Sequence, residues 1–384
     1  MIELAELTGM TWDHTRGYDP MVVTAQIFCE KHPNTAINWQ KRSLQAFADR
    51  PLDAMAREFD LMVIDHPHLG EAAKSGMLVA FDDICTPAEL DTLAQQSVGV
   101  SHKSYEFDNK QWALAIDAAT PVAAYRPDLL EDVPQTWQQV IALSKQGKVL
   151  WPLIPINALM SFFNLLANVN CPFGEGSNGV EAIGVETDIA INILEQMKLV
   201  SDNLPQQCFK MDPIDAYEWL SSRSSHSYVP FLYGYSNYSR SGFRPHLVKV
   251  ANIPCLGDDG PIGSPIGGTG IAISKYCKNI ELAKQYALWI ASADCQKGVF
   301  YQAGGQPANL VAWQDDYCNQ HSHGFFADTL ETLEKSYLRP RHNGYMAFQD
   351  IAGDIIFEFL TQNISAKTTA EKINHEYQRS FEHE

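Results

Sequence analysis

The first 120 residues alternate between short apolar runs and segments with helical spacing. Residues 61–64 are apolar at every position, which is typical of a strand buried on both faces of a parallel sheet. Strands are also predicted at residues 7–12, 36–39 and 112–117, and helices at 20–31, 51–59 and 87–96. This alternation predicts an α/β fold with a parallel sheet covered by helices on both faces.

A second set of elements follows residue 120. Thr136 and Gln139 have the spacing of a capping box, and Asp212 before Pro213 begins another helix. Apolar periodicity predicts helices at residues 158–168 and 188–202, and a strand at residues 228–233. Near the C-terminus, Thr368 and Glu371 predict the start of the last helix. The glycine-rich residues 174–179 follow no strand, so we interpret them as a surface loop.

Residues 248–274 are rich in glycine and proline, which indicates a crossing or hinge between two lobes. After it come a predicted strand at residues 271–274 and a helix capped by Asn279. A length of 384 residues also favours two lobes, because single domains rarely grow beyond about 250–300 residues.

The charge of the chain limits its possible partners, and its cysteines bear on its cellular compartment. The net charge is −18 and no Lys/Arg cluster interrupts it, which argues against nucleic acid and anionic membranes as partners. No apolar run approaches the roughly 18 residues that a membrane span needs. The eight cysteines form no Cys-x-x-Cys pair, so we expect buried thiols, which favour a reducing compartment. The N-terminal residues do not resemble a signal peptide, so either a signal was removed or the protein stays in the cytosol.

Polar residues gather where predicted strands end. Trp12, Asp13, His14 and Arg16 lie in a loop between a strand and a helix, for which we predict Asp19 as the N-cap and Pro20 as the first residue. Asp65 and His66 follow a second strand, and Asp117 ends a third. Ligands of open α/β sheets bind outside the carboxyl ends of strands, so these side chains are expected to converge on one crevice.

Metal binding, hydrolysis and stacking on a sugar are further chemical roles that these and nearby side chains suggest. Asp65, His66 and His68 are metal-ligand types, but their spacing matches no metal motif, so a polar loop is preferred and no metal or cofactor is expected. Hydrolase motifs are missing, and Asp65 with Asp117 is a weak sign of a glycosidase. Tyr233 and Tyr235 belong to an aromatic and polar run that would suit stacking on a sugar, or would pack as a strand end.

The order of the motifs resembles extracellular solute-binding proteins of ABC importers, specifically the sugar-binding branch similar to maltodextrin-binding proteins. No single motif is diagnostic, but four stretches occur in the family's order across nearly the whole chain. They are residues 10–18 before a helix and His32-Pro33, residues 60–66, residues 124–137, and residues 267–274 continuing through a helix to residues 304–307.

The resemblance implies a two-lobe, type II periplasmic-binding-protein-like clamp with discontinuous lobes, closing on a ligand about its hinge. The first lobe would comprise residues 1–116 and 266–310, the second 121–250 and 311–384, with crossings near 117–120 and 251–265. The family's ligand contacts would correspond here to Trp12, Asp13, His14, Arg16, Asp65, His66, Asp117, Asn157, Tyr233, Tyr235, Gly268 and Thr269.

The expected function is binding of a small polar solute, most simply a carbohydrate, for an ABC transporter. His14, Arg16 and His66 are more cationic than a neutral sugar requires, so a sugar acid or another small carboxylate is an alternative. A cytosolic ligand sensor without a transport role is another, and an enzyme is not expected. The resemblance implies a monomer in the periplasm or outside the cell, with a permease as partner if the protein is exported. A cytoplasmic location is the alternative, because no signal peptide is recognisable and the chain has eight scattered cysteines.

Overall fold

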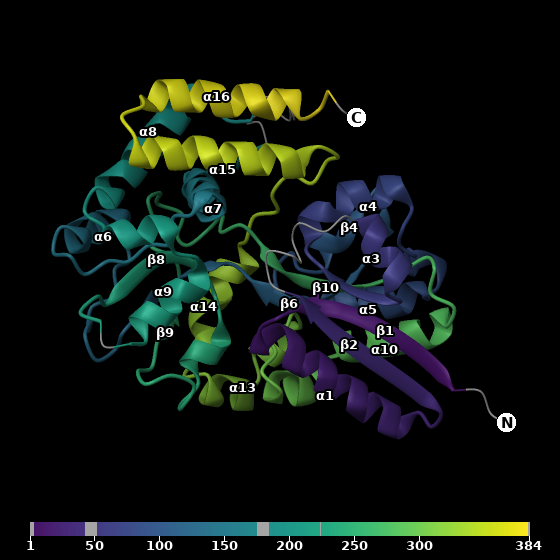
Figure 1. Ribbon diagram of the computed structural model, residues 1–384. Coiled ribbons are helices and arrows are strands. Elements are labelled where there is room, and N and C mark those ends of the chain that lie inside the picture. Colours follow the sequence, from purple (N-terminus) through teal and green to yellow (C-terminus); the bar gives the residue numbers. More distant parts are fainter. Residues whose placement is uncertain (1–3, 43–51, 175–183, 223, 383–384) are drawn as a thin grey trace. The chain divides into compact units, whose positions relative to one another are not determined.

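The computed structural model (Figure 1) describes residues 4–42, 52–174, 184–222 and 224–382. The chain divides into two units, Met1–Ala118 with Gly267–Cys318, and Ala119–Ile266 with Asn319–Glu384. Each unit therefore combines two separate stretches of sequence. Residues 311–318, which the sequence prediction assigned to the second lobe, fall in the first unit in this division. Most of the loop predicted at residues 174–179 lies outside the described residues.

The sheet of the first unit has, within the described residues, five strands in the order β2-β1-β3-β10-β6. β1 is parallel to β2 and β3, whereas β10 is antiparallel to β3, so the sheet is mixed where a parallel one was predicted. Gly270 pairs with Ile64, which places the start of β10 at the edge where β3 ends. The strands are β1 (Ala5–Trp12), β2 (Thr35–Arg42), β3 (Leu61–Ile64), β6 (Leu114–Ala119) and β10 (Gly267–Ile273), and a separate hairpin joins β4 (Glu106–Phe107) to β5 (Lys110–Gln111).

Helices cover this sheet and share its core. Tyr286 of α10 is fully buried, and its hydroxyl lies 2.9 Å from the Thr24 hydroxyl of α1, which joins the two helices. The helices are α1 (Thr15–Lys31), α3 (Leu52–Glu58), α4 (Leu69–Ser75), α5 (Pro87–Gln95), α10 (Ile280–Ala291), α11 (Ala293–Cys295) and α12 (Leu310–Trp313), and α13 (Asp316–His321) crosses the boundary between the units. Short turns are η1 (His66–His68), η2 (Phe81–Asp83), η3 (Lys103–Tyr105) and the π-helical η6 (Gln296–Phe300).

The second unit has an antiparallel sheet in the order β8-β7-β9 within its described residues. Aromatic rings form the centre of its core: Trp137 stacks on Phe231 at 5.3 Å and meets Trp151 edge-on at 5.5 Å. Such pairs stabilise by about 0.5–1.5 kcal/mol beyond their buried area. The strands are β7 (Pro121–Tyr125), β8 (Tyr228–Tyr233) and β9 (Lys249–Ala251).

Long helices complete this unit, and α15 packs on α7 and α16, while α16 also packs on α8 (Figure 1). The helices are α6 (Trp137–Ser144), α7 (Pro155–Asn168), α8 (Thr187–Ser201), α9 (Pro213–Leu220), α14 (Phe325–Glu334), α15 (Tyr345–Thr361) and α16 (Ala366–Arg379), with the short η4 (Gln206–Lys210) and η5 (Ser236–Ser239). Within the described residues, no helix is both long and apolar enough to span a membrane. No disulfide links the eight cysteines, all of which lie in the described ranges.

Helix starts test the capping predictions. The boxes of Thr136 with Gln139 and of Asp212 with Asp215 are both formed, which confirms the starts of α6 and α9. The predicted start of the last helix at Thr368 is wrong. The Ser365 hydroxyl accepts a hydrogen bond from the Thr368 amide at 3.1 Å, so α16 begins three residues earlier.

The C-terminal end of α16 is held by a histidine that is neutral in the folded chain. His342 stacks on Phe381 at 3.9 Å, and its Nε2 lies 2.7 Å from the Ser380 hydroxyl. That hydroxyl donates to the Tyr377 carbonyl, so Nε2–H is the donor to Ser380. Burial lowers the pKa of the His342 imidazole to about 4.

We expect acid to destabilise the protein through this site. Unfolded histidine has a pKa of about 6.5, so the unfolded chain binds more protons and stability falls as the pH drops from about 6.5 to about 4. His342→Phe keeps the stacking and cannot titrate, so its free energy of unfolding in urea should fall less steeply over that interval. Equal pH dependence of the two proteins would contradict the prediction.

Candidate functional site

The N-cap of α1 is His14, whereas the sequence predicted Asp19. Nδ1 of His14 accepts a hydrogen bond from the Arg16 amide at 3.0 Å, so α1 begins at Thr15. The predicted start at Asp19-Pro20 is therefore wrong, because the imidazole already supplies the acceptor that the first helical amides need. Pro20 is buried inside the helix.

Trp12 packs directly on the first turn of α1. The side chain is 6% exposed, and a methyl group on Gly17 would stand 2.3 Å from its ring. The Thr11 hydroxyl donates to the Gly17 carbonyl at 3.1 Å and fixes the same turn. Asp13 is exposed, and its carboxylate pairs with Lys41 at 2.7 Å. The loop thus presents Trp12 as a buried ring and Asp13 as a paired charge.

Arg16 and Asp117 form a buried bidentate ion pair. Nε lies 2.7 Å from Oδ2 and Nη2 lies 2.5 Å from Oδ1, and the two residues are 4% and 2% exposed. Burial raises the pKa of the Asp117 carboxyl, and the Arg16 guanidinium acts against that shift. The negative charge of Asp65 raises the pKa further.

His66 is fully buried, with Nδ1 3.1 Å from Oδ1 of Asp65. Its ring meets Tyr105 edge-on at 6.3 Å. The Tyr105 hydroxyl lies 3.3 Å from the Ile64 carbonyl oxygen and 3.2 Å from that of Gly268, so it joins the end of β3 to the start of β10. Tyr105 was missed from the sequence, since it lies in a short turn and acts through backbone groups distant in sequence.

Gly268 and Thr269 complete this edge of the sheet. Gly268 has φ +96°, and a methyl group there would stand 2.2 Å from the Asp117 carbonyl oxygen, so only glycine fits. Thr269 is 8% exposed, and its hydroxyl has no hydrogen-bond partner among the described residues. Because a buried polar group without a partner costs about 1–3 kcal/mol, this hydroxyl marks a place for a ligand or a water molecule.

The second unit holds the other predicted residues. Asn157 lies in the first turn of α7, is 9% exposed, and its Nδ2 has no partner within the described ranges. Asn157 and Tyr233 line one small cavity, together with Pro121, Pro152, Met160, Ser161, Phe231 and Leu232. Ser161, one helical turn after Asn157, was missed, although its i+4 spacing could have indicated it. Tyr235 lies outside this lining, and its amide donates to the Tyr217 hydroxyl at 3.3 Å.

Asp65, His66 and His68 have metal-ligand side chains, although their spacing favoured a polar loop. Among the described residues, no group of three or more His, Cys, Asp or Glu side chains could hold a metal ion. Asp65 and His66 instead contact each other beside Tyr105.

Comparison with known proteins gives a consistent picture. Residues 25–325 match the family model described as bacterial extracellular solute-binding protein. Maltose-bound MalE3 of T. maritima is 18% identical with a TM-score of 0.80, and the match covers 98% of this chain and 99% of that one. A solute-binding protein of an ABC transporter from Agrobacterium radiobacter, in complex with ribitol, is 18% identical with a TM-score of 0.79 and the same coverage. The acarbose-binding GacH receptor of Streptomyces glaucescens is 13% identical, covers 99% of both chains and has a TM-score of 0.80.

The contact of Trp12 with Gly17 predicts that a glycine-to-alanine substitution in this helix lowers the stability of the protein. Glycine to alanine within a helix normally stabilises by up to about 1 kcal/mol. Gly17→Ala should instead lower the melting temperature, because the new methyl group would displace the Trp12 ring. A Gly17→Ala protein as stable as the wild type would show that Trp12 is not held there.

Proposed function

Because the chain belongs to the bacterial extracellular solute-binding proteins, we propose that it binds a neutral carbohydrate or polyol and passes it unchanged to an ABC importer. Similar structures were solved with maltose, ribitol and acarbose, which supports this class of ligand. The family description also supports a location in the periplasm or outside the cell. The ligand-contacting residues that we propose are Trp12, Asp13, His14, Arg16, Asp65, His66, Asp117, Asn157, Tyr233, Tyr235, Gly268 and Thr269.

The observation that carries the proposal is that two buried polar atoms, the Thr269 hydroxyl and the Asn157 Nδ2, have no hydrogen-bond partner among the described residues. Both belong to residues at least nine-tenths buried, in parts of the fold that the sequence already indicated as ligand-facing. Sugar hydroxyls donate and accept hydrogen bonds, so they can satisfy a threonine hydroxyl and an amide alike.

The ion pair favours a neutral ligand over a sugar acid. Recognition of a carboxylate by arginine usually needs two parallel N–H donors from the guanidinium. Nε and Nη2 of Arg16 already donate to the two oxygens of Asp117. Asp65 adds a further negative charge close by, which would repel an anionic ligand.

A thermal-shift panel tests the ligand class. A ligand that binds only the folded protein stabilises it by about 2.7 kcal/mol at a hundred times its Kd. Maltose, maltotriose and ribitol represent the neutral class, and glucuronate and gluconate represent the acidic class. We expect the melting temperature to rise with at least one neutral compound and with neither acid. A rise with the acids alone would contradict the proposal.

Thr269→Val separates ligand binding from stability. Valine has nearly the same shape, so removing a buried hydroxyl that has no partner within the described ranges should leave the melting temperature equal or higher. The Kd for the neutral ligand found by the panel should rise about fivefold to tenfold, measured by calorimetric titration.

Thr24→Val is the matched control. The Thr24 side chain is fully buried, and its hydroxyl donates to the Pro20 carbonyl at 2.6 Å and lies 2.9 Å from the Tyr286 hydroxyl. We therefore expect a lower melting temperature and an unchanged Kd. If Thr269→Val behaves in the same way as Thr24→Val, Thr269 supports the fold and does not contact the solute.

A further inference from the structure

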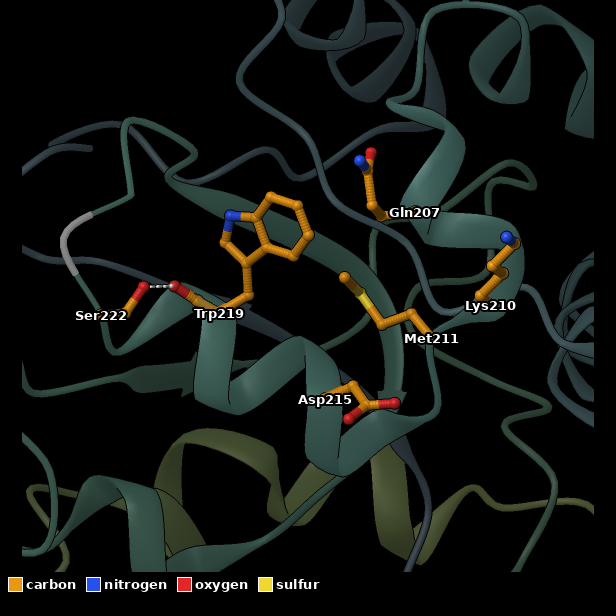
Figure 2. Close-up of a pocket in the computed structure, with 6 residues that line it drawn as sticks. All are labelled: Gln207, Lys210, Met211, Asp215, Trp219 and Ser222. Carbon is orange, nitrogen blue, oxygen red and sulfur yellow. Dashed lines mark hydrogen bonds between the residues drawn. The ribbon is translucent and has the colours of Figure 1, made fainter.

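An open groove lies in the second unit between η4 and α9, with an empty volume of about 740 Å³ including solvent (Figure 2). Its lining comes from one short stretch of sequence: Gln207, Lys210, Met211, Asp215, Trp219 and Ser222. None of these residues belongs to the ligand site proposed above. The groove therefore needs an explanation of its own.

Trp219 is the dominant side chain of the groove. It is half-buried, and it does not belong to the hydrophobic core of the second unit. Its ring meets His226 edge-on at 5.9 Å, and its Nε1–H has no acceptor among the described residues. Figure 2 shows the indole among the lining residues, with the side chain of Met211 pointing toward it. A large aromatic ring is thus held beside solvent without contributing to the core.

The helix that carries Trp219 is fixed at both ends. Asp212 and Asp215 form the capping box at its start, where the Asp215 amide donates to Asp212 at 2.8 Å. At its end, the buried guanidinium of Arg126 donates to the carbonyls of Leu220 and Ser222 at 3.0 and 2.9 Å. A rigid support lowers the entropy cost of ordering a binding surface.

Polar side chains also line the groove. The Gln207 amide lies across the groove from the ring, and Asp215 precedes Trp219 by one helical turn (Figure 2). The side chains of Gln207 and Lys210 have no hydrogen-bond partner among the described residues, while the Asp215 carboxylate accepts from the Asp212 amide. The groove thus combines one apolar plate with an amide, an ammonium group and a carboxylate.

This combination points to the chemical class of the ligand. A pyranose ring has an apolar face of C–H groups and a rim of hydroxyls that donate and accept, which suits an aromatic plate with mixed polar neighbours. A purely apolar ligand would gain little in so open a groove, because much of its surface would stay in water. We propose that this groove is a second saccharide-binding site, with Trp219 as the stacking residue.

The test follows Trp219 directly by fluorine NMR of protein labelled with 5-fluorotryptophan, in which Trp219→Phe identifies its resonance among the eight tryptophans. The probes are maltotriose, cellotriose and xylotriose at millimolar concentration. We expect at least one to shift the Trp219 resonance in a saturable manner. The same titration should be unchanged in Thr269→Val, because the groove shares no residue with the other site.

Two glutamines of η4 provide a matched pair. Gln207→Ala should weaken the saturating trisaccharide about fivefold through the loss of one hydrogen bond. Gln206→Ala removes an exposed glutamine that does not line the groove, and should change nothing. The proposal is overturned if no trisaccharide shifts the resonance, if the shift disappears in Thr269→Val, or if the two glutamine variants behave alike.

Discussion

The buried ion pair between Arg16 and Asp117 sets the conditions for the rest of the first unit. Two opposite charges removed from water are tolerated only when their geometry is held closely, and removing one partner costs about 3–5 kcal/mol. The start of α1 and the end of β6 are therefore fixed to each other. The carbonyl oxygen of Asp117 leaves no room for a side chain at Gly268, so β10 packs closely against β6 at the same residue. Because the guanidinium of Arg16 is paired with the Asp117 carboxylate, its positive charge is neutralised within the protein.

Local sequence patterns were sufficient for much of the fold. The strands at residues 61–64 and 228–233 were predicted to the residue, because each is a short run of apolar or aromatic side chains with clear ends. The capping box of Thr136 with Gln139 was also predicted, since all of its atoms lie within four residues. The family resemblance supplied the lobed architecture, which agrees with similar structures at TM-scores of 0.73–0.80.

The chemistry of the site was harder to predict, because it depends on partners distant in sequence. Arg16 was predicted to contact a ligand, but its ion pair with Asp117, 101 residues away, was not predicted as a fixed feature. His14 was expected to be a cation, whereas its ring caps α1. Tyr105 joins two strands through carbonyl oxygens, and no spacing rule identifies such a contact. In the second unit, the Tyr217 hydroxyl of α9 accepts a hydrogen bond from the Tyr235 amide, so the helix that carries Trp219 also holds the backbone at Tyr235.

The position of β10 has a consequence for how the chain is made. In the described sheet, β10 lies between β3 and β6, yet it follows the stretch Ala119–Ile266 of the second unit in the sequence. During synthesis, β3 therefore keeps an unpaired edge and β6 has no neighbour until residues 267–273 leave the ribosome. Exposed edges of this kind invite association between chains, and sequence-distant pairing slows folding. The N-terminal half emerges first, but its sheet is completed only after most of the second unit has been translated.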